Sequence, residues 1–184
     1  MFRKLSIILV TGLLAFTAAC SSNSSSTNAV SATGAAVSVA ATSTPAACPT
    51  KNTESFAKTK FVADLAIAGG AFKRYIYTPA KDGKFKQGAN GRVLAFVKAA
   101  AAGALTVNRL AAAKTAAEAN PTLCKLLAQP IANFSAAVSG LINKAKGGSI
   151  DPSDVDNATG YLSDLHGAAS QGGAPFTDNT NTSA

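Results

Sequence analysis

Residues 92–119 read RVLAFVKAAAAGALTVNRLAAAKTAAEA, and this stretch decides the fold. Alanine is the best intrinsic helix former, and it dominates both this stretch and the wider region 57–145, which shows no strand-like alternation. Lys98 and Arg109 leave ten residues between them, whereas a membrane-spanning helix needs about 20. The stretch therefore predicts a long buried core helix, and the chain is predicted to be all-α.

One face of this long helix is predicted to point inward, because its residues recur at spacings of three and four. They are Leu94, Val97, Ala101, Leu105, Asn108 and Ala112. A preceding helix is predicted from Thr53, as its N-cap, to Thr78, because the residue before Pro79 resists the helical region. Its Asp64 has Lys60 four residues earlier, which predicts an ion pair within that helix.

Two further helices open on the same signal, a capping side chain followed by proline. Asn120-Pro121 begins one of them, in which Pro130 is expected to cause a kink or a split. Asp151-Pro152 begins the other, which Gly172-Gly173 ends. Four amphipathic helices with short connections predict a small antiparallel bundle over 51–173, followed by a flexible polar tail over 174–184.

Residues 1–19 have the composition of a cleaved signal peptide. Two basic residues precede a short apolar run, and small residues lead to Cys20. This ending resembles the lipobox of bacterial lipoproteins, whose cysteine is lipidated, although Thr17 stands where that pattern usually has leucine. We expect an extracytoplasmic chain held to the cell membrane by lipid on Cys20; the alternative is an ordinary secreted protein.

Residues 20–50 are expected to form a disordered tether. They are rich in Ser, Thr and Ala and carry no charge and no aromatic ring before Lys51, so they cannot bury enough apolar surface to order themselves. Cys48, near the end of this tether, and Cys124 are the two cysteines that remain. In an oxidising exterior such a pair is usually bonded, so a disulfide is predicted; the alternative is two free thiols.

Charge is divided unevenly along the chain. Residues 51–146 hold fifteen Lys and Arg against four Asp and Glu, whereas the residues from 147 onward hold five Asp and no base. The densest basic stretch is interleaved with aromatic rings and offers six candidate contacts to an anionic surface: Lys73, Arg74, Lys81, Lys84, Lys86 and Arg92. Anionic lipid or cell-wall polymer is the expected partner, and nucleic acid is not, because an exported domain rarely meets it. The alternatives are a solvated basic face without a partner, which packs beside the acidic last helix, and a face that binds a protein.

Catalytic and metal chemistry is not indicated. His166 is the only histidine, no nucleophile-elbow motif accompanies it, and a lone helical histidine is more often a boundary residue than a base. The aspartates at 151, 154 and 156 fail the calcium-loop pattern and are better explained as helix N-terminal residues. We expect no enzyme activity, no metal and no cofactor.

Several segments resemble a group of small exported proteins from actinobacteria: 61–72, 75–79, 83–86, Gly91-Arg92 and 122–125. These segments share aromatic, basic and glycine positions and no catalytic motif, so the resemblance implies an exported helical domain and no activity. The function expected from the sequence is that of a membrane-anchored structural or binding module. The alternative is a small-molecule carrier or sensor with an apolar pocket between helices near Pro130.

Overall fold

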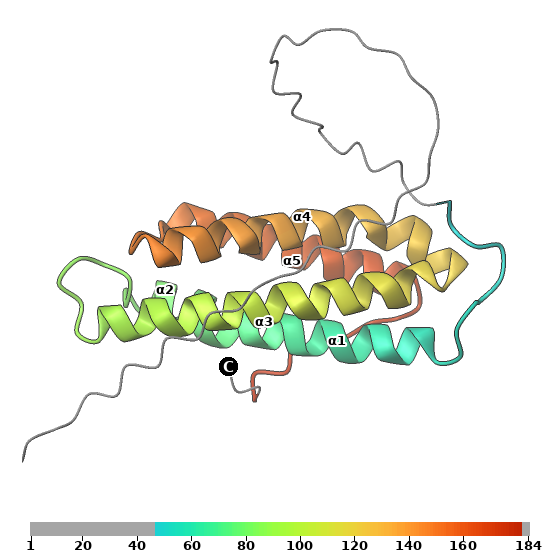
Figure 1. The fold of residues 1–184 in the computed structure, drawn as a ribbon, viewed down its shortest axis with the longest axis horizontal. Helices are drawn as coiled ribbons and strands as arrows, with labels where there is room; N and C mark the ends of the chain where they lie inside the picture. The colour runs from blue at the N-terminus through green and yellow to red at the C-terminus, as the bar shows by residue number, and fades with distance from the viewer. Residues whose placement is uncertain (1–46, 182–184) are drawn as a thin grey trace, which may run out of the picture. The chain divides into compact units, whose positions relative to one another are not determined.

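The computed structural model describes residues 47–181, and this part of the chain is all-α. Four long helices, α1 (Ala57–Phe72), α3 (Arg92–Glu118), α4 (Pro121–Lys146) and α5 (Pro152–Gln171), run up and down in chain order (Figure 1). The predicted small antiparallel bundle is confirmed. The signal peptide over 1–19, the lipidation site at Cys20 and most of the tether lie outside the described residues.

The first helical rod is longer than predicted at its C-terminal end. Helix α1 begins at Ala57, later than Thr53, because Phe56 takes a left-handed conformation with φ of 62°. A π-helical turn, η1 (Lys73–Tyr77), and a short α2 (Thr78–Lys81) then carry the rod through Pro79. The N–H of Thr78 bonds to the carbonyl of Lys73, five residues back, and this wider turn accommodates the proline ring without ending the rod.

The two proline-opened helices begin where their capping signals predict. The Asn120 side chain accepts hydrogen bonds from the N–H groups of Thr122 and Leu123, and Asp151 forms a reciprocal capping box with Asp154. Pro130 does not split α4, which is helical from Pro121 to Lys146. Neighbouring helices hold that helix on both sides, so the loss of one backbone hydrogen bond does not end it.

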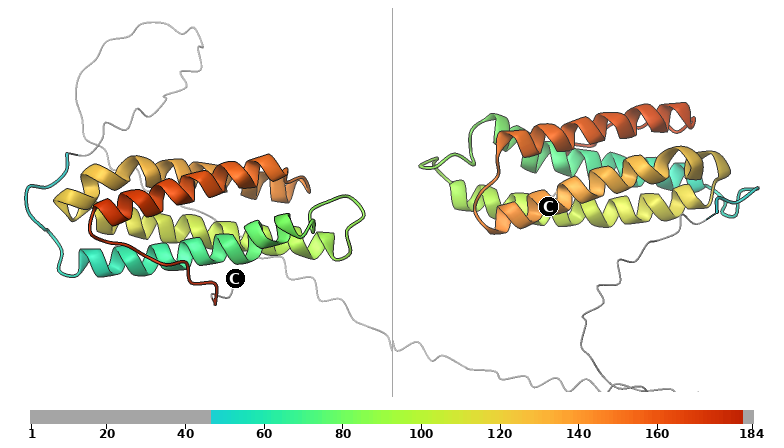
Figure 2. Two further views of the ribbon diagram at one scale, coloured as in Figure 1. Left: turned by 180° about the vertical axis from the view of Figure 1, so that it is seen from behind. Right: turned by 90° about the horizontal axis from the view of Figure 1, so that it is seen from above.

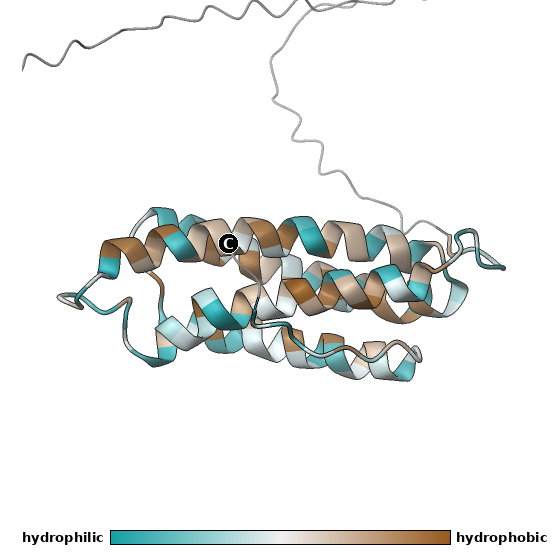
Figure 3. Ribbon diagram, turned by 90° about the horizontal axis from the view of Figure 1, so that it is seen from below, coloured by the Kyte–Doolittle hydropathy of each residue, from teal (hydrophilic) through white to brown (hydrophobic). Residues whose placement is uncertain are grey.

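The core lies between α1, α3, α4 and α5, and hydrophobic and polar positions recur in bands along each helix (Figure 3). Helix α3 packs against α1 and α4, and α4 packs against α5. The Phe72 and Phe134 rings meet edge to face at 5.3 Å between centroids, and both are fully buried. Gly103 sits where a Cβ would lie 2.5 Å from the Ile142 side chain, so glycine allows α3 and α4 to approach closely.

The inward face of α3 was predicted wrongly. Its buried residues are Phe96, Ala99, Ala102, Gly103, Thr106, Leu110, Ala113, Ala116 and Ala117. Leu94 and Val97, predicted to be inside, are 58% and 60% exposed. Alanine lines nearly every face of this helix, so the apolar periodicity is weak, and packing against α1 and α4 selects which face is buried.

The predicted disulfide joins Cys48 to Cys124, with a Cα–Cα distance of 5.7 Å. It fixes the segment before α1 to the first turn of α4. The Asn120 amide reinforces this junction by donating to the Asn52 side-chain oxygen at 2.8 Å, and the Thr53 N–H donates to the Ala119 carbonyl at 3.0 Å. The start of the domain is therefore tied to the connection between α3 and α4.

Candidate functional site

The C-terminal strap, residues 174–181, is ordered against the bundle and corrects the prediction of a flexible tail. It bridges α5 and α1 after the last helix ends (Figure 2). The Phe176 ring stacks on the His166 ring at 3.9 Å between centroids, and the Asn179 N–H donates to the Ala66 carbonyl at 2.7 Å. Ala174 and Phe176 are buried, so the strap completes the core where α1 faces α5.

Two glycines of α1 make room for the strap. A Cβ on Gly69 would lie 1.9 Å from the Asp178 carboxylate, and one on Gly70 would lie 1.8 Å from the Asn179 carbonyl oxygen. No side chain fits at such distances. The pair of glycines inside a helix, which costs helix stability, is explained by this close approach of a second backbone.

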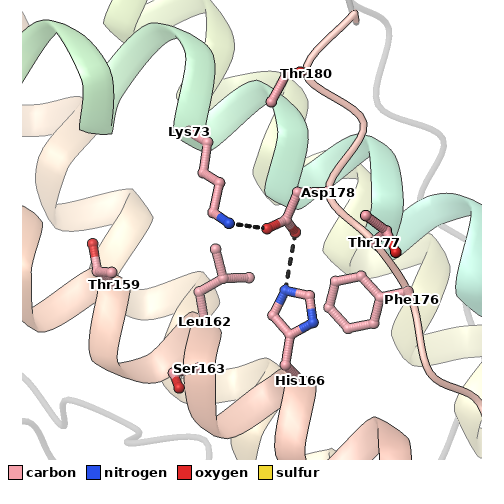
Figure 4. A pocket seen from close by; sticks show the side chains of 9 residues that line it. All are labelled: Lys73, Thr159, Leu162, Ser163, His166, Phe176, Thr177, Asp178 and Thr180. Atoms are coloured by element: carbon pink, nitrogen blue, oxygen red, sulfur yellow. Dashed lines mark hydrogen bonds and ion pairs between the residues drawn. The ribbon is translucent and has the colours of Figure 1, made fainter.

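Asp178 is the centre of the strap's polar contacts (Figure 4). One carboxylate oxygen lies 2.6 Å from the Lys73 ammonium, and the other lies 3.1 Å from His166 Nε2. The side chain is only 5% exposed. Because a buried carboxylate needs a partner, these two contacts satisfy the Asp178 side chain and fix the strap to both η1 and α5.

A pocket of about 430 Å³ opens beside these residues. Lys73, Leu162, Ser163, His166, Phe176 and Asp178 are among the residues that line it. The Ser163 hydroxyl points away from the His166 ring, so serine, histidine and aspartate do not form a relay for nucleophilic attack (Figure 4). Within 47–181, no group of three or more His, Cys, Asp or Glu side chains is placed to hold a metal ion.

Four of the six basic residues predicted to contact an anionic surface are engaged within the domain. Lys73 pairs with Asp178, and Lys81 pairs with Asp156 at 2.8 Å. Arg74 donates to the Thr180 carbonyl. Arg92 donates to the carbonyls of Phe85 and Gly148 at 3.0 and 2.6 Å, an arrangement that fixes the loop before α3.

The acidic last helix therefore neutralises part of the basic face. The hydrogen bond that Lys81 donates to Asp156, together with the charge of that carboxylate, raises the pKa of Lys81 above its ordinary value. The hydrogen bond that Lys144 donates to Asp154 likewise raises the pKa of Lys144. Asp64 also pairs with another helix: it contacts Arg109 of α3 at 3.2 Å, while Lys60 contacts Glu54, so the predicted Lys60–Asp64 pair is wrong. Most of the acidic residues after residue 147 therefore form ion pairs with lysines of other helices.

Four exposed lysines keep their charge available at the end of the bundle where α3 begins and α4 ends. Lys84 and Lys86 lie in the loop before α3, Lys98 lies on α3 and Lys146 ends α4. None of them pairs with an acidic side chain among the described residues. We call these four residues the free lysines.

An apolar surface lies among the free lysines. Val93, Leu94 and Val97, here called the α3 tip, are 77%, 58% and 60% exposed. One hollow beside the tip is lined by Leu94 with Lys84 and Lys98, and another by Val93 and Val97 with Lys146. The tip is thus bordered by positive charge on both sides.

Helix α3 is also the one described helix whose length and apolar composition would allow it to cross a membrane. The core helix of a soluble bundle passes the same test, and α3 packs against α1 and α4 along its length. The length and apolar composition of α3 are therefore only weak evidence for a membrane span.

Sequence reasoning missed the α3 tip and the strap. Leu94 and Val97 of the tip were predicted to lie in the core, and the strap was predicted to be part of a flexible tail because polar residues dominate 177–184. Phe176 and the Gly69-Gly70 pair were the available signals, an isolated aromatic after the last helix and two glycines inside a helix. No family model, curated protein or solved structure matches the chain.

Proposed function

We propose that this protein is an exported lipoprotein, anchored by lipid on Cys20, which binds anionic polymers or lipids of the cell envelope without catalysing a reaction. The free lysines carry the proposal. They are gathered at one end of the bundle, while the other cations of the predicted basic face are neutralised or bonded within the domain. Each lysine near an anionic surface contributes about 1 kcal/mol to binding, so four acting together give measurable affinity.

The signal-like residues 1–19 and the lipobox-like ending at Cys20 support the anchor. An anchor would hold the free lysines at high effective concentration near the envelope, so weak individual contacts would suffice. The Cys48–Cys124 disulfide agrees with an oxidising compartment, where such bonds persist.

The binding proposal is tested with the chain from Ser21 onward, which keeps the whole helical domain but lacks the lipid. Its sedimentation with phosphatidylglycerol vesicles and with soluble poly(glycerol phosphate) is compared with that of K84S/K86S. The matched control is K51S/K125S, which removes two exposed lysines that have no acidic partner among the described residues. We expect loss of binding only in K84S/K86S; equal binding by the two variants contradicts the proposal.

The anchor needs a separate measurement in cells. A Cys20→Ser variant is expected to appear in the medium, whereas the unsubstituted chain stays with the membrane fraction. A Cys20→Ser chain that remains equally membrane-bound contradicts anchoring through lipid on this residue.

A small-molecule carrier is the second candidate, and the pocket beside His166 favours it. The pocket has a mixed lining, with an apolar wall from Leu162 and Phe176 and polar groups from Lys73 and Ser163. It lies at the strap and not near Pro130, where the sequence placed it. A thermal-shift screen tests this candidate: a ligand that stabilises the protein should lose its effect in Leu162→Trp, which fills the pocket.

A further inference from the structure

We infer that the α3 tip inserts into the interface of an anionic phospholipid bilayer, with the free lysines around it contacting the headgroups. This inference rests on the proposed function and deepens it, because it selects a bilayer over a soluble wall polymer as the partner. The tip occupies positions i, i+1 and i+4 of α3, so its three side chains project from one side of the helix.

The tip is exposed even though the inward face of α3 is packed against the core at this point. Phe96 and Ala99, its neighbours on α3, are buried, and the Phe96 ring stacks on Phe85 at 5.0 Å between centroids. The helix therefore has a filled inward face at the same level as the tip. Three adjacent aliphatic side chains left in water on the opposite side form an apolar patch of the kind that marks an interaction surface.

The chemistry around the tip fits a bilayer interface. Surfaces that lie in this interface combine aliphatic side chains, which enter the headgroup and acyl boundary, with lysines that contact anionic headgroups. Lys84 and Lys98 share a hollow with Leu94, and Lys146 shares one with Val93 and Val97. Insertion of the tip would therefore bring lysines on both of its sides close to the headgroups.

A second copy of the chain fits this surface less well. In a two-fold symmetric contact the same patch meets itself, so the lysines beside one tip would lie against those beside the other. Like charges brought together in this way oppose association. An anionic bilayer instead offers the opposite charge to every lysine around the tip.

The proposed anchor can reach this end of the domain. The disulfide fixes Cys48 at the start of α4, whereas the tip lies at the start of α3, the opposite end of the bundle (Figure 1). Helix α3 has 27 residues, a length of about 40 Å. The 28 residues from Cys20 to Cys48 span up to about 95 Å when extended. A lipid on Cys20 and an inserted tip are thus geometrically compatible.

Tryptophan fluorescence tests insertion directly, because the chain contains no tryptophan. In the chain from Ser21 onward, Leu94→Trp should shift its emission to the blue with phosphatidylglycerol vesicles and not with soluble poly(glycerol phosphate). Phe56→Trp is the matched control, since Phe56 is 79% exposed before α1, away from the tip. An unshifted Leu94→Trp signal on vesicles that bind the protein overturns the inference.

A triple variant, V93S/L94S/V97S, provides the second test and should remain folded because all three side chains are exposed. We expect its vesicle affinity to fall at least about tenfold, since three aliphatic groups lose their transfer from water, while binding to the soluble polymer is unchanged. Unchanged vesicle binding, or a dimer of the unsubstituted chain in sedimentation that the triple variant abolishes, overturns the inference. Loss of polymer binding in K84S/K86S, with no effect of the triple variant on vesicles, would sustain the proposed function alone.

Discussion

Removal of the Cys48–Cys124 disulfide should destabilise the domain strongly without changing its fold. The bond closes a loop with a sequence separation of 76 residues. In the chain-entropy model, closing a loop of this length lowers the entropy of the unfolded chain by about 15 cal/mol/K, which stabilises the folded state by about 4.5 kcal/mol at 25 °C. The entropy of unfolding of a domain of about 135 residues is about 0.28 kcal/mol/K, so the expected fall in Tm is about 16 °C.

Thermal unfolding followed by circular dichroism would measure this loss in two ways. The variant C48A/C124A and the unsubstituted chain in reductant should melt at the same temperature, because both lack the cross-link. Agreement between them controls for the replacement of Cys124, which is buried. A loss below about 2 kcal/mol in both would refute the loop-length reasoning and show that the unfolded chain is already restricted.

Three further changes test the packing and the charges. Gly70→Ala should detach the C-terminal strap and cost about 1.5–3 kcal/mol, which is the contribution from burial of its phenylalanine. As a control in the same melting experiment, Gly140→Ala should be neutral or stabilising, because the new Cβ would point into open space. Phe134→Ala should cost about 3–5 kcal/mol in urea denaturation, since the ring is fully buried. The pKa of Lys144 is raised by Asp154, so its stabilising contact is present below about pH 10 and lost as the pH rises further. Lys144→Gln should therefore lower Tm at pH 8 and flatten its fall at alkaline pH; a parallel fall contradicts this assignment.

The helical class and most helix boundaries follow from local features of the sequence. Asn120-Pro121 and Asp151-Pro152 begin helices because their side chains satisfy backbone N–H groups within three residues, which no distant contact needs to arrange. The pairing of Cys48 with Cys124 could also be predicted from the sequence, because the only other cysteine, Cys20, was expected to carry lipid. Alanine content and the absence of strand-like alternation were together sufficient to predict the all-α class.

The position of the candidate site could not be predicted from local features of the sequence. Leu94 and Val97 of the α3 tip were predicted to lie in the core because of their spacing along the helix, yet a helix with alanine on every side has no strong periodicity to distinguish its faces. Likewise, four of the six predicted cationic contacts are bonded within the domain, which could not be predicted because most of their partners are distant in sequence. Lys73 and Asp178 are 105 residues apart, yet their charged groups lie 2.6 Å apart.

The sequence by itself determined that this chain is all-α and that two of its helices begin at Asn120-Pro121 and Asp151-Pro152, and it predicted the disulfide. Those properties depend on interactions within a few residues, or on the count of cysteines. Only the tertiary structure decided which face of α3 meets solvent, which lysines remain available and that the C-terminal strap closes over α1 at Gly69 and Gly70. Each of these depends on what another helix places opposite a residue, and local propensity carries no information about that.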